Sequence, residues 1–151
     1  MNRQKNLIMI KEKYLGAYMK TARVFAELSS AKRKHVGAVI VKDDRIISIG
    51  YNGMPSGWDN NCEQVVGHNH EGPVLKTKAE VLHAESNAIA KLAKSTESGD
   101  GASMFITCSP CIECAKMIFQ SGIKEVFYDE DYRDDGGIIF LNKCGITVKQ
   151  I

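Results

Sequence analysis

In the first part of the chain, the spacing of apolar residues changes from one typical of a helix to one typical of β-strands. Apolar residues recur every three or four positions between Lys11 and Ser29, and these are Tyr14, Leu15, Tyr18, Met19, Ala22, Phe25 and Leu28. That spacing predicts one face of an amphipathic helix. Two β-branched runs follow, Val36–Val41 and Arg45–Tyr51, and the polar residues between them favour a turn. The two runs predict an antiparallel β-hairpin.

The middle of the chain has no sustained hydrophobic period. Glycine and proline interrupt the segment from Asn52 to Ala79, at Gly53, Pro55, Gly57, Gly67, Gly72 and Pro73. We therefore expect an irregular insertion at about residues 53–80, and insertions of this length usually have a function. A helical pattern resumes over Glu80–Ser95, and Ser103–Thr107 is predicted to be a strand.

The last part of the chain alternates between helices and strands. The pattern predicts a helix over Cys111–Ser121, a strand over Lys124–Tyr128, a short helix over Ile138–Lys143 and a strand over Ile146–Lys149. Strand–helix–strand units imply parallel strands, whereas the early hairpin is antiparallel. The sequence thus predicts a single α/β domain over residues 1–151, a three-layer α/β/α sandwich with a mixed five-stranded sheet.

Composition narrows the classes of function. The chain has 151 residues, 44% of them hydrophobic and 25% charged, which is ordinary for a globular protein. Its net charge of +2 gives no reason to expect a nucleic-acid partner. No apolar run approaches the ~20 residues of a membrane span, and the start has no secretion signal. We expect a cytoplasmic protein without a membrane partner.

The cysteines are distributed like metal ligands. There are five, an odd number, and Cys108, Cys111 and Cys114 lie within seven residues. In a chain without a secretion signal, this pattern favours metal binding over disulfides.

Two short motifs can form one zinc site. His83-Ala84-Glu85 offers an imidazole and a carboxylate, and Pro110-Cys111-Ile112-Glu113-Cys114 offers two thiolates on one face of a helix. With His83, Cys111 and Cys114 as ligands, a tetrahedral zinc keeps one position open, as in catalytic sites. Glu85 is then free to carry protons in a hydrolytic reaction. The alternative is a closed site that includes Cys108, which we disfavour because Pro110 and the strand-to-helix turn place Cys108 at the strand end, facing the core.

The two motifs are part of a wider similarity. Together with Val36–Val41, Gly50-Tyr51-Asn52-Gly53-Met54-Pro55-Ser56-Gly57 and Gln120–Val126, they resemble the deoxycytidylate (dCMP) deaminase family from about Ala31 onwards. The resemblance implies the cytidine deaminase fold, one catalytic Zn²⁺, and hydrolysis of dCMP to dUMP and ammonia for thymidylate synthesis. It also implies homo-oligomers, often hexamers, and in many members regulation by dCTP and dTTP.

The resemblance also implies roles for individual positions. His83, Cys111 and Cys114 match the zinc ligands, and Glu85 matches the proton shuttle. The substrate contacts that it implies are a sugar–phosphate contact from Asn52, a phosphate contact from Arg33, base-edge contacts from the backbone of Ala84 and Ser109, and closure by Tyr132 and Arg133.

Two of these assignments have plainer alternatives. A phosphate needs cations or N–H groups, which the run Lys32-Arg33-Lys34 can supply, but such a run can also be a solvated surface. Asn52 precedes Gly53, and an Asn-Gly pair is common in turns that bind nothing.

The insertion contains further residues with metal-ligand chemistry, Cys62, His68 and His70. Some members of the family carry a second, structural zinc in this region, and some have a cysteine pair here. This chain has only Cys62, followed by Glu63. We therefore expect ordinary surface histidines and do not favour a second zinc.

Other functions share the same zinc chemistry. A tRNA adenosine deaminase has both motifs, but it resembles this pattern with a shorter connection than the 31 positions from Asn52 to His83. A tRNA partner also favours a more basic surface. Guanine and riboflavin-pathway deaminases are further alternatives. A non-catalytic, zinc-stabilised binding module is another, and it would not need Glu85.

Overall fold

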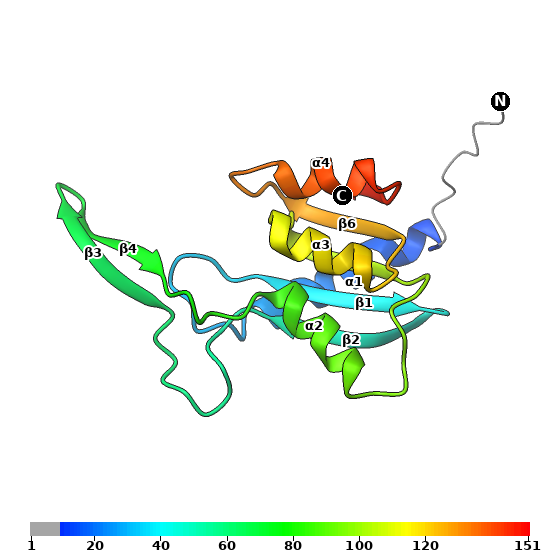
Figure 1. Cartoon of the computed structure of the whole chain (residues 1–151), viewed down its shortest axis with the longest axis horizontal. Helices are drawn as coiled ribbons and strands as arrows, with labels where there is room; N and C mark the ends of the chain where they lie inside the picture. The colour runs from blue at the N-terminus through cyan, green and yellow to red at the C-terminus, as the bar shows by residue number, and fades with distance from the viewer. Residues whose placement is uncertain (1–9) are drawn as a thin grey trace.

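The computed structural model describes residues 10–151 as a central sheet with helices on both faces and a hairpin that extends from it (Figure 1). Residues 1–9, part of the segment considered above for a secretion signal, lie outside the described range.

The central sheet has five strands in the order β2-β1-β5-β6-β7. β1 (Gly37–Lys42) pairs antiparallel with both β2 (Arg45–Tyr51) and β5 (Ser103–Cys108). β6 (Glu125–Glu130) pairs parallel with β5, and β7 (Thr147–Gln150) pairs parallel with β6. The predicted mixed sheet, with its antiparallel hairpin and parallel C-terminal strands, is confirmed.

The helices form a layer on each face of this sheet. α1 (Glu12–Ala26) covers one face and buries its apolar stripe against Val39, Val41, Phe105 and Phe127. α2 (Ala84–Ala93), α3 (Ile112–Gln120) and α4 (Gly136–Lys143) contribute to the core on the other face. The predicted three-layer α/β/α sandwich is confirmed. Within residues 10–151, no helix has the length and apolar character needed to cross a membrane.

The insertion differs from the prediction, because it contains a second, two-stranded sheet. β3 (Glu63–Asn69) and β4 (Gly72–Thr77) pair antiparallel, and the hairpin projects away from the central sheet (Figure 1). Most side chains of both strands are exposed or partly exposed. The prediction of an irregular segment was wrong because strands without a buried face need no alternation of apolar and polar residues.

The two helices that carry the predicted ligands begin later than the sequence suggests. α2 starts at Ala84 instead of Glu80, because backbone hydrogen bonds of 3.1 and 2.8 Å hold Leu82 in an isolated bridge with Gly53. His83 is thereby the extended N-cap residue of α2. α3 starts at Ile112, which leaves Cys111 as its N-cap. Two predicted ligands therefore occupy equivalent places, each directly before a helix.

Two glycines allow the backbone to pack closely around these helix starts. A Cβ atom at Gly50 of β2 would lie against the carbonyl of Ala84 and 2.7 Å from the nitrogen of Ala88. A Cβ atom at Gly137 of α4 would lie against the carbonyl oxygen of Pro110 and 2.9 Å from its carbon. Real Cβ contacts are not this short, so a larger residue would move α2 or the turn that precedes α3.

Candidate metal centre

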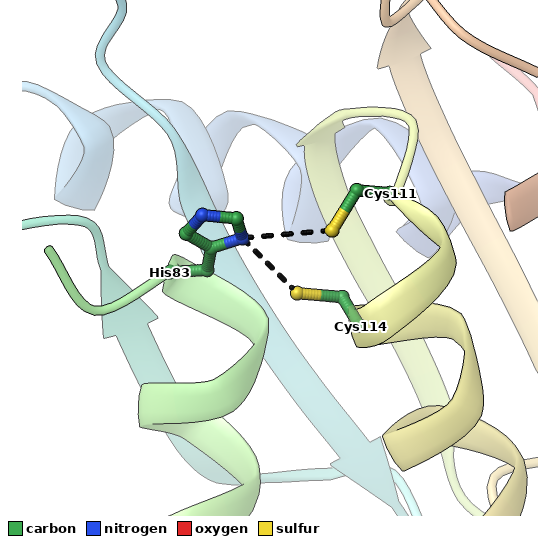
Figure 2. A group of neighbouring side chains, drawn as sticks. All are labelled: His83, Cys111 and Cys114. Carbon is green, nitrogen blue, oxygen red and sulfur yellow. Dashed lines mark hydrogen bonds between the residues drawn. The ribbon is translucent and has the colours of Figure 1, made fainter. Parts of the chain in front are cut away.

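Three potential metal ligands converge where α2 and α3 begin. The Nδ1 atom of His83 lies 3.3 Å from the Sγ atom of Cys114 and 3.7 Å from the Sγ atom of Cys111 (Figure 2). All three ligand atoms lie within 4.8 Å of one another, and no other group of this kind occurs in residues 10–151. The structure thus assembles the ligand set that the two sequence motifs predict.

The dimensions of this triad suit zinc. With Zn–N and Zn–S bonds of about 2.0 and 2.3 Å, tetrahedral geometry requires an N···S separation of about 3.5 Å. The measured distances of 3.3 and 3.7 Å lie on either side of that value. Imidazole and thiolate are also ligands that zinc prefers. The residues present therefore fit the metal, with three protein ligands and one open position.

The two cysteines interact in a way that prepares the site for a cation. Two hydrogen bonds lower the pKa of Cys111 to about 4, and the bond from Cys114 has a larger effect than the bond from His83. The same bond, together with burial, raises the pKa of Cys114, which therefore keeps its proton while Cys111 is a thiolate. The bond to Cys111 also raises the pKa of His83. A divalent cation would displace the protons and take both sulfurs as thiolates.

Glu85 lies in the first turn of α2, beside the triad, and is 5% exposed. Burial raises the pKa of its carboxyl group, although a backbone hydrogen bond and His83 act in the opposite direction. A carboxyl group with a raised proton affinity beside a metal centre is suited to accept and return protons.

Cys108, considered above as a fourth ligand, is not part of the triad. It is the last residue of β5 and is 3% exposed. Burial raises the pKa of its thiol, while Lys34 acts in the opposite direction. Although it is buried as expected, it also lines the cavity described next.

A cavity of about 710 Å³ lies beside the metal centre and is lined by His83, Glu85 and Cys111. Its volume is within the usual range of small-molecule sites, roughly 300–1,000 Å³. The substrate-binding residues predicted from the sequence also line it, and these are Arg33, Asn52, Ala84, Ser109, Tyr132 and Arg133. The fold therefore brings residues from distant segments of the chain around one space.

Several of these residues also hold the walls of the cavity together. The Oδ1 atom of Asn52 accepts the N–H of Val36 at 2.8 Å, and its Nδ2 atom donates to the carbonyl of Lys34 at 2.8 Å. The Oγ atom of Ser109 accepts the N–H of Tyr132 at 2.6 Å. The guanidinium group of Arg133 lies 5.6 Å from the ring centre of Tyr132.

The sequence did not indicate one side of the cavity, the base of the β3–β4 hairpin. Glu63, Lys76, Thr77 and Lys78 all line the cavity. The only sequence signal was the alternation of lysine and threonine in Lys76-Thr77-Lys78, which is too short to identify a strand.

The residues considered for a second zinc lie in different environments. Cys62 is fully buried, and its Sγ atom lies 3.6 Å from both the Ser30 hydroxyl and the Asn60 carbonyl oxygen. His68 and His70 are exposed residues of the hairpin.

Three comparisons with known proteins agree with one another. The family model described as the cytidine and deoxycytidylate deaminase zinc-binding region matches residues 12–130. The ComE operon protein 2 of Bacillus subtilis is 37% identical over 139 residues, covering 89% of this chain and 69% of the relative. Human deoxycytidylate deaminase is 36% identical over 147 residues, covering 88% of this chain and 76% of the relative. A solved structure, the dCMP deaminase from cyanophage S-TIM5 in complex with dCMP and dUMP, is 45% identical with a TM-score of 0.85 and covers 94% of this chain and 99% of that one.

Proposed function

Because the chain belongs to the cytidine and deoxycytidylate deaminase family, we propose that it catalyses the hydrolysis of dCMP to dUMP and ammonia. The observation that carries the proposal is the His83–Cys111–Cys114 triad, with the buried Glu85 beside it, at the wall of a cavity of about 710 Å³. Relatives and a solved structure named for this reaction match most of the chain.

His83, Cys111 and Cys114 would hold the zinc ion, and the cavity is open beside them. When bound, zinc lowers the pKa of water towards neutrality and so supplies a nucleophile at physiological pH. The protein contributes the fixed ligand geometry, because two of the three ligands are N-caps of helices that pack into the core.

Glu85 is assigned the proton transfers. Its carboxylate takes a proton from the attacking water, delivers it to the ring nitrogen next to the reacting carbon, and passes the second proton to the leaving ammonia. Overall, one water is consumed and one ammonia is released. Its burial supports this role, because a raised pKa brings a carboxyl group closer to the working pH.

The backbone of Ala84 and Ser109 is assigned to the edge of the base. The N–H of Ala84 is in the first turn of α2, where N–H groups have no acceptor within the helix. The N–H of Ser109 already donates to the carbonyl of Glu130 at 2.8 Å, which leaves the Ser109 carbonyl as the acceptor for an amino group of the substrate. This donor and acceptor would recognise the cytosine edge.

The sugar and phosphate would lie towards Asn52, Arg33, Tyr132 and Arg133, which line the same cavity. Asn52 already bonds the backbone of Lys34 and Val36, so its contact with the sugar would use the remaining N–H and lone pair of its amide. The guanidinium group of Arg133 lies over the ring of Tyr132, and this pair is assigned to closing over the nucleotide.

We further infer a cytoplasmic homo-oligomer, with a hexamer favoured, that responds to dCTP and dTTP. The resemblance to the family supports regulation and assembly. Exposed apolar side chains on the neighbouring helices α3 and α4 also support assembly, and these are Ile112, Phe119 and Ile139, exposed by 41%, 47% and 46%. Light scattering of the purified protein tests the assembly, and a monomer at micromolar concentration would contradict it.

The activity is tested by measuring ammonia release from dCMP, dCTP, cytidine and tRNA with zinc-loaded protein. We expect release from dCMP, and release slower by about 10²–10⁴-fold when Glu85→Gln replaces the wild type. Release from tRNA alone would identify a tRNA adenosine deaminase instead. If no ammonia is released from any of the four substrates, the non-catalytic binding module would be favoured.

A further inference from the structure

The segment that carries His83 and Glu85 runs along the outer edge of the central sheet. α2 packs over β2, the edge strand (Figure 1). Resting on the deaminase activity proposed above, we propose that Asn87 and Lys91 of α2 are positioning residues for that reaction. Their side chains bind backbone carbonyls of β2 and so fix the start of the helix relative to the metal centre.

The carbonyls that they bind point away from the sheet. The N–H of Asn52 donates to the carbonyl of Val36, directly before β1, at 3.2 Å, so the backbone of Asn52 faces β1. In an antiparallel pair, successive residues face the partner strand and the outer edge in turn. Ile49, Tyr51 and Gly53 therefore face the outer edge, where backbone groups need partners from outside the sheet.

Two side chains of α2 bond these edge groups in register. The Nδ2 atom of Asn87 donates to the carbonyl of Tyr51 at 2.8 Å, and the Nζ atom of Lys91 donates to the carbonyl of Ile49 at 2.8 Å. Residues four apart in a helix are separated by about 6 Å along its axis, and residues two apart in a strand by about 7 Å. The two spacings match, so both bonds form together. Sliding the helix by one residue, about 1.5 Å, would strain both.

The backbone supplies a third contact along the same edge, before the helix begins. Gly53 and Leu82 exchange the hydrogen bonds of 3.1 and 2.8 Å that form the isolated bridge. His83 and Glu85 lie between this bridge and Asn87, so their place along the edge is fixed from both sides. The N–H of Asn87 also donates to the carbonyl of His83 at 3.0 Å. Asn87 therefore connects a predicted metal ligand to the end of β2.

The face of α2 that packs on the sheet is held by other contacts. The hydroxyl of Ser48, which is 8% exposed, donates to the carbonyl of Ala88 at 2.6 Å. A Cβ atom at Gly50 would lie 3.1 Å from the Cβ atom of Asn87. These contacts keep the helix close to the strand. The bonds of Asn87 and Lys91 add a defined position along the strand.

Small movements of α2 affect the metal centre because its ligands come from two helices. The Nδ1 atom of His83 at the start of α2 lies 3.3 and 3.7 Å from the sulfurs of Cys114 and Cys111 at α3. Metal–ligand distances tolerate changes of only about 0.2 Å. Proton transfer is also sensitive, since a misplacement of about 1 Å can lower a rate by about 10²-fold. Asn87 and Lys91 should therefore influence zinc binding and turnover, although neither lines the cavity.

The first experiment removes the donor of Asn87 without changing the shape of the side chain. Asn87→Asp places a carboxylate oxygen against the carbonyl of Tyr51, which repels it. We expect kcat for dCMP to fall by about 10–100-fold with little change in KM, and zinc affinity in a chelator competition to fall by about tenfold. Asn142→Asp is the matched control, because it makes the same change at an exposed position of α4.

The second experiment separates the donor of Lys91 from its apolar stem. Lys91→Met keeps the stem but cannot donate, whereas Lys91→Arg keeps a cationic donor for the carbonyl of Ile49. We expect the methionine variant to lower kcat several-fold and the arginine variant to restore most of the loss. Lys94→Met is the control. Lys94 is the exposed C-cap residue of the same helix, and its side chain forms none of the hydrogen bonds or ion pairs found within residues 10–151.

A third measurement reports on the ligand geometry without relying on deamination. Co²⁺ loaded in place of zinc has visible absorption bands whose position and intensity depend on the arrangement of its ligands. We expect Asn87→Asp to change these bands and Asn142→Asp to keep the wild-type spectrum.

The outcomes distinguish this positioning role from the proposed function. Wild-type kcat, zinc affinity and Co²⁺ spectrum in Asn87→Asp and Lys91→Met would overturn the role and leave dCMP deamination intact. Lower stability in urea with unchanged kcat and zinc affinity would also overturn it, since it would indicate a purely structural contribution. If the wild type releases no ammonia from dCMP but the variants lose zinc affinity and change the spectrum, the positioning of His83 stands and the proposed function fails.

Discussion

The metal centre and the base of the hairpin line the same cavity but are encoded differently. His83, Cys111 and Cys114 lie in two short motifs, and each motif contains a helix N-cap that fixes its ligands locally. Arg33, Glu63 and Thr77 come from three segments that meet only through strand pairing and side-chain bonds. Local sequence therefore brings the metal ligands together, whereas tertiary structure assembles the hairpin side of the cavity.

Replacing Glu85 gives the largest expected effect and tests whether the chemistry resides at the metal centre. Glu85→Gln should lower kcat for dCMP by about 10²–10⁴-fold, because the amide cannot carry protons. Zinc content, measured by elemental analysis, should be unchanged, since Glu85 is not one of the three ligands. Glu113→Gln is the matched control, because Glu113 lies between the two cysteines but is exposed and paired with Lys116 at 2.9 Å. Full activity of Glu85→Gln would contradict the mechanism.

Removing the metal tests whether the site is catalytic or structural. Chelation should abolish deamination and lower Tm, because the ligands bind zinc only in the folded chain. Circular dichroism should still report a folded protein, because apolar residues on both faces of the sheet form the core without the ligands. Activity should return with added Zn²⁺. Complete unfolding of the metal-free protein would instead assign the zinc a structural role.

The order and type of the main elements could be predicted because each has a buried face. The stripe of α1 and the β-branched run of β1 both pack into the core, so burial produces a period that the sequence displays. The hairpin could not be predicted in this way, because Val65, Val66 and Val74 are exposed by 55%, 55% and 38%. The sequence predicted that α2 begins at Glu80, before its actual start at Ala84. The bridge between Leu82 and Gly53 delays the helix, and such a contact between distant segments leaves no local pattern in the sequence.

The residues of the candidate site also fall into those that the sequence could group and those that it could not. Spacing was sufficient to group His83, Glu85, Cys111 and Cys114, since all four lie within the first turn or at the cap of a helix. Spacing could not indicate that Glu63 bonds the backbone of Arg33, 30 positions away. Nor could it indicate that Asn52 bonds the backbone of Lys34 and Val36, in addition to lining the cavity.

A substitution in α4 tests whether packing from outside the motifs also supports the metal centre. Gly137→Ala would push a Cβ atom against Pro110, directly before the ligand Cys111. We expect a loss of about 1–3 kcal/mol in the free energy of unfolding, the usual cost of overpacking, and weaker zinc binding. Urea denaturation and zinc competition with a chelator measure the two effects.

The control for this substitution is Gly16→Ala in α1, where a Cβ atom meets nothing within 4 Å. Alanine is favoured over glycine inside a helix, so this variant should gain about 0.5–1 kcal/mol. If Gly137→Ala keeps both its stability and its zinc affinity, the motif residues alone determine the geometry of the metal centre. The metal centre would then differ even more from the hairpin base, which depends on contacts between distant segments.

The smallest expected effect concerns the tip of the hairpin, which should differ from its base. The His70 side chain is 89% exposed, and the only ion pair found for it in residues 10–151 is with Glu71 at 3.7 Å. Cys62 is fully buried directly before β3, and the two residues do not form part of any metal-ligand group in residues 10–151. His70→Ala should therefore leave zinc at one per chain and dCMP turnover within about twofold, since surface substitutions away from such sites have small effects. A wild-type value near two zinc ions per chain that falls in His70→Ala would contradict this and make the hairpin a second metal site.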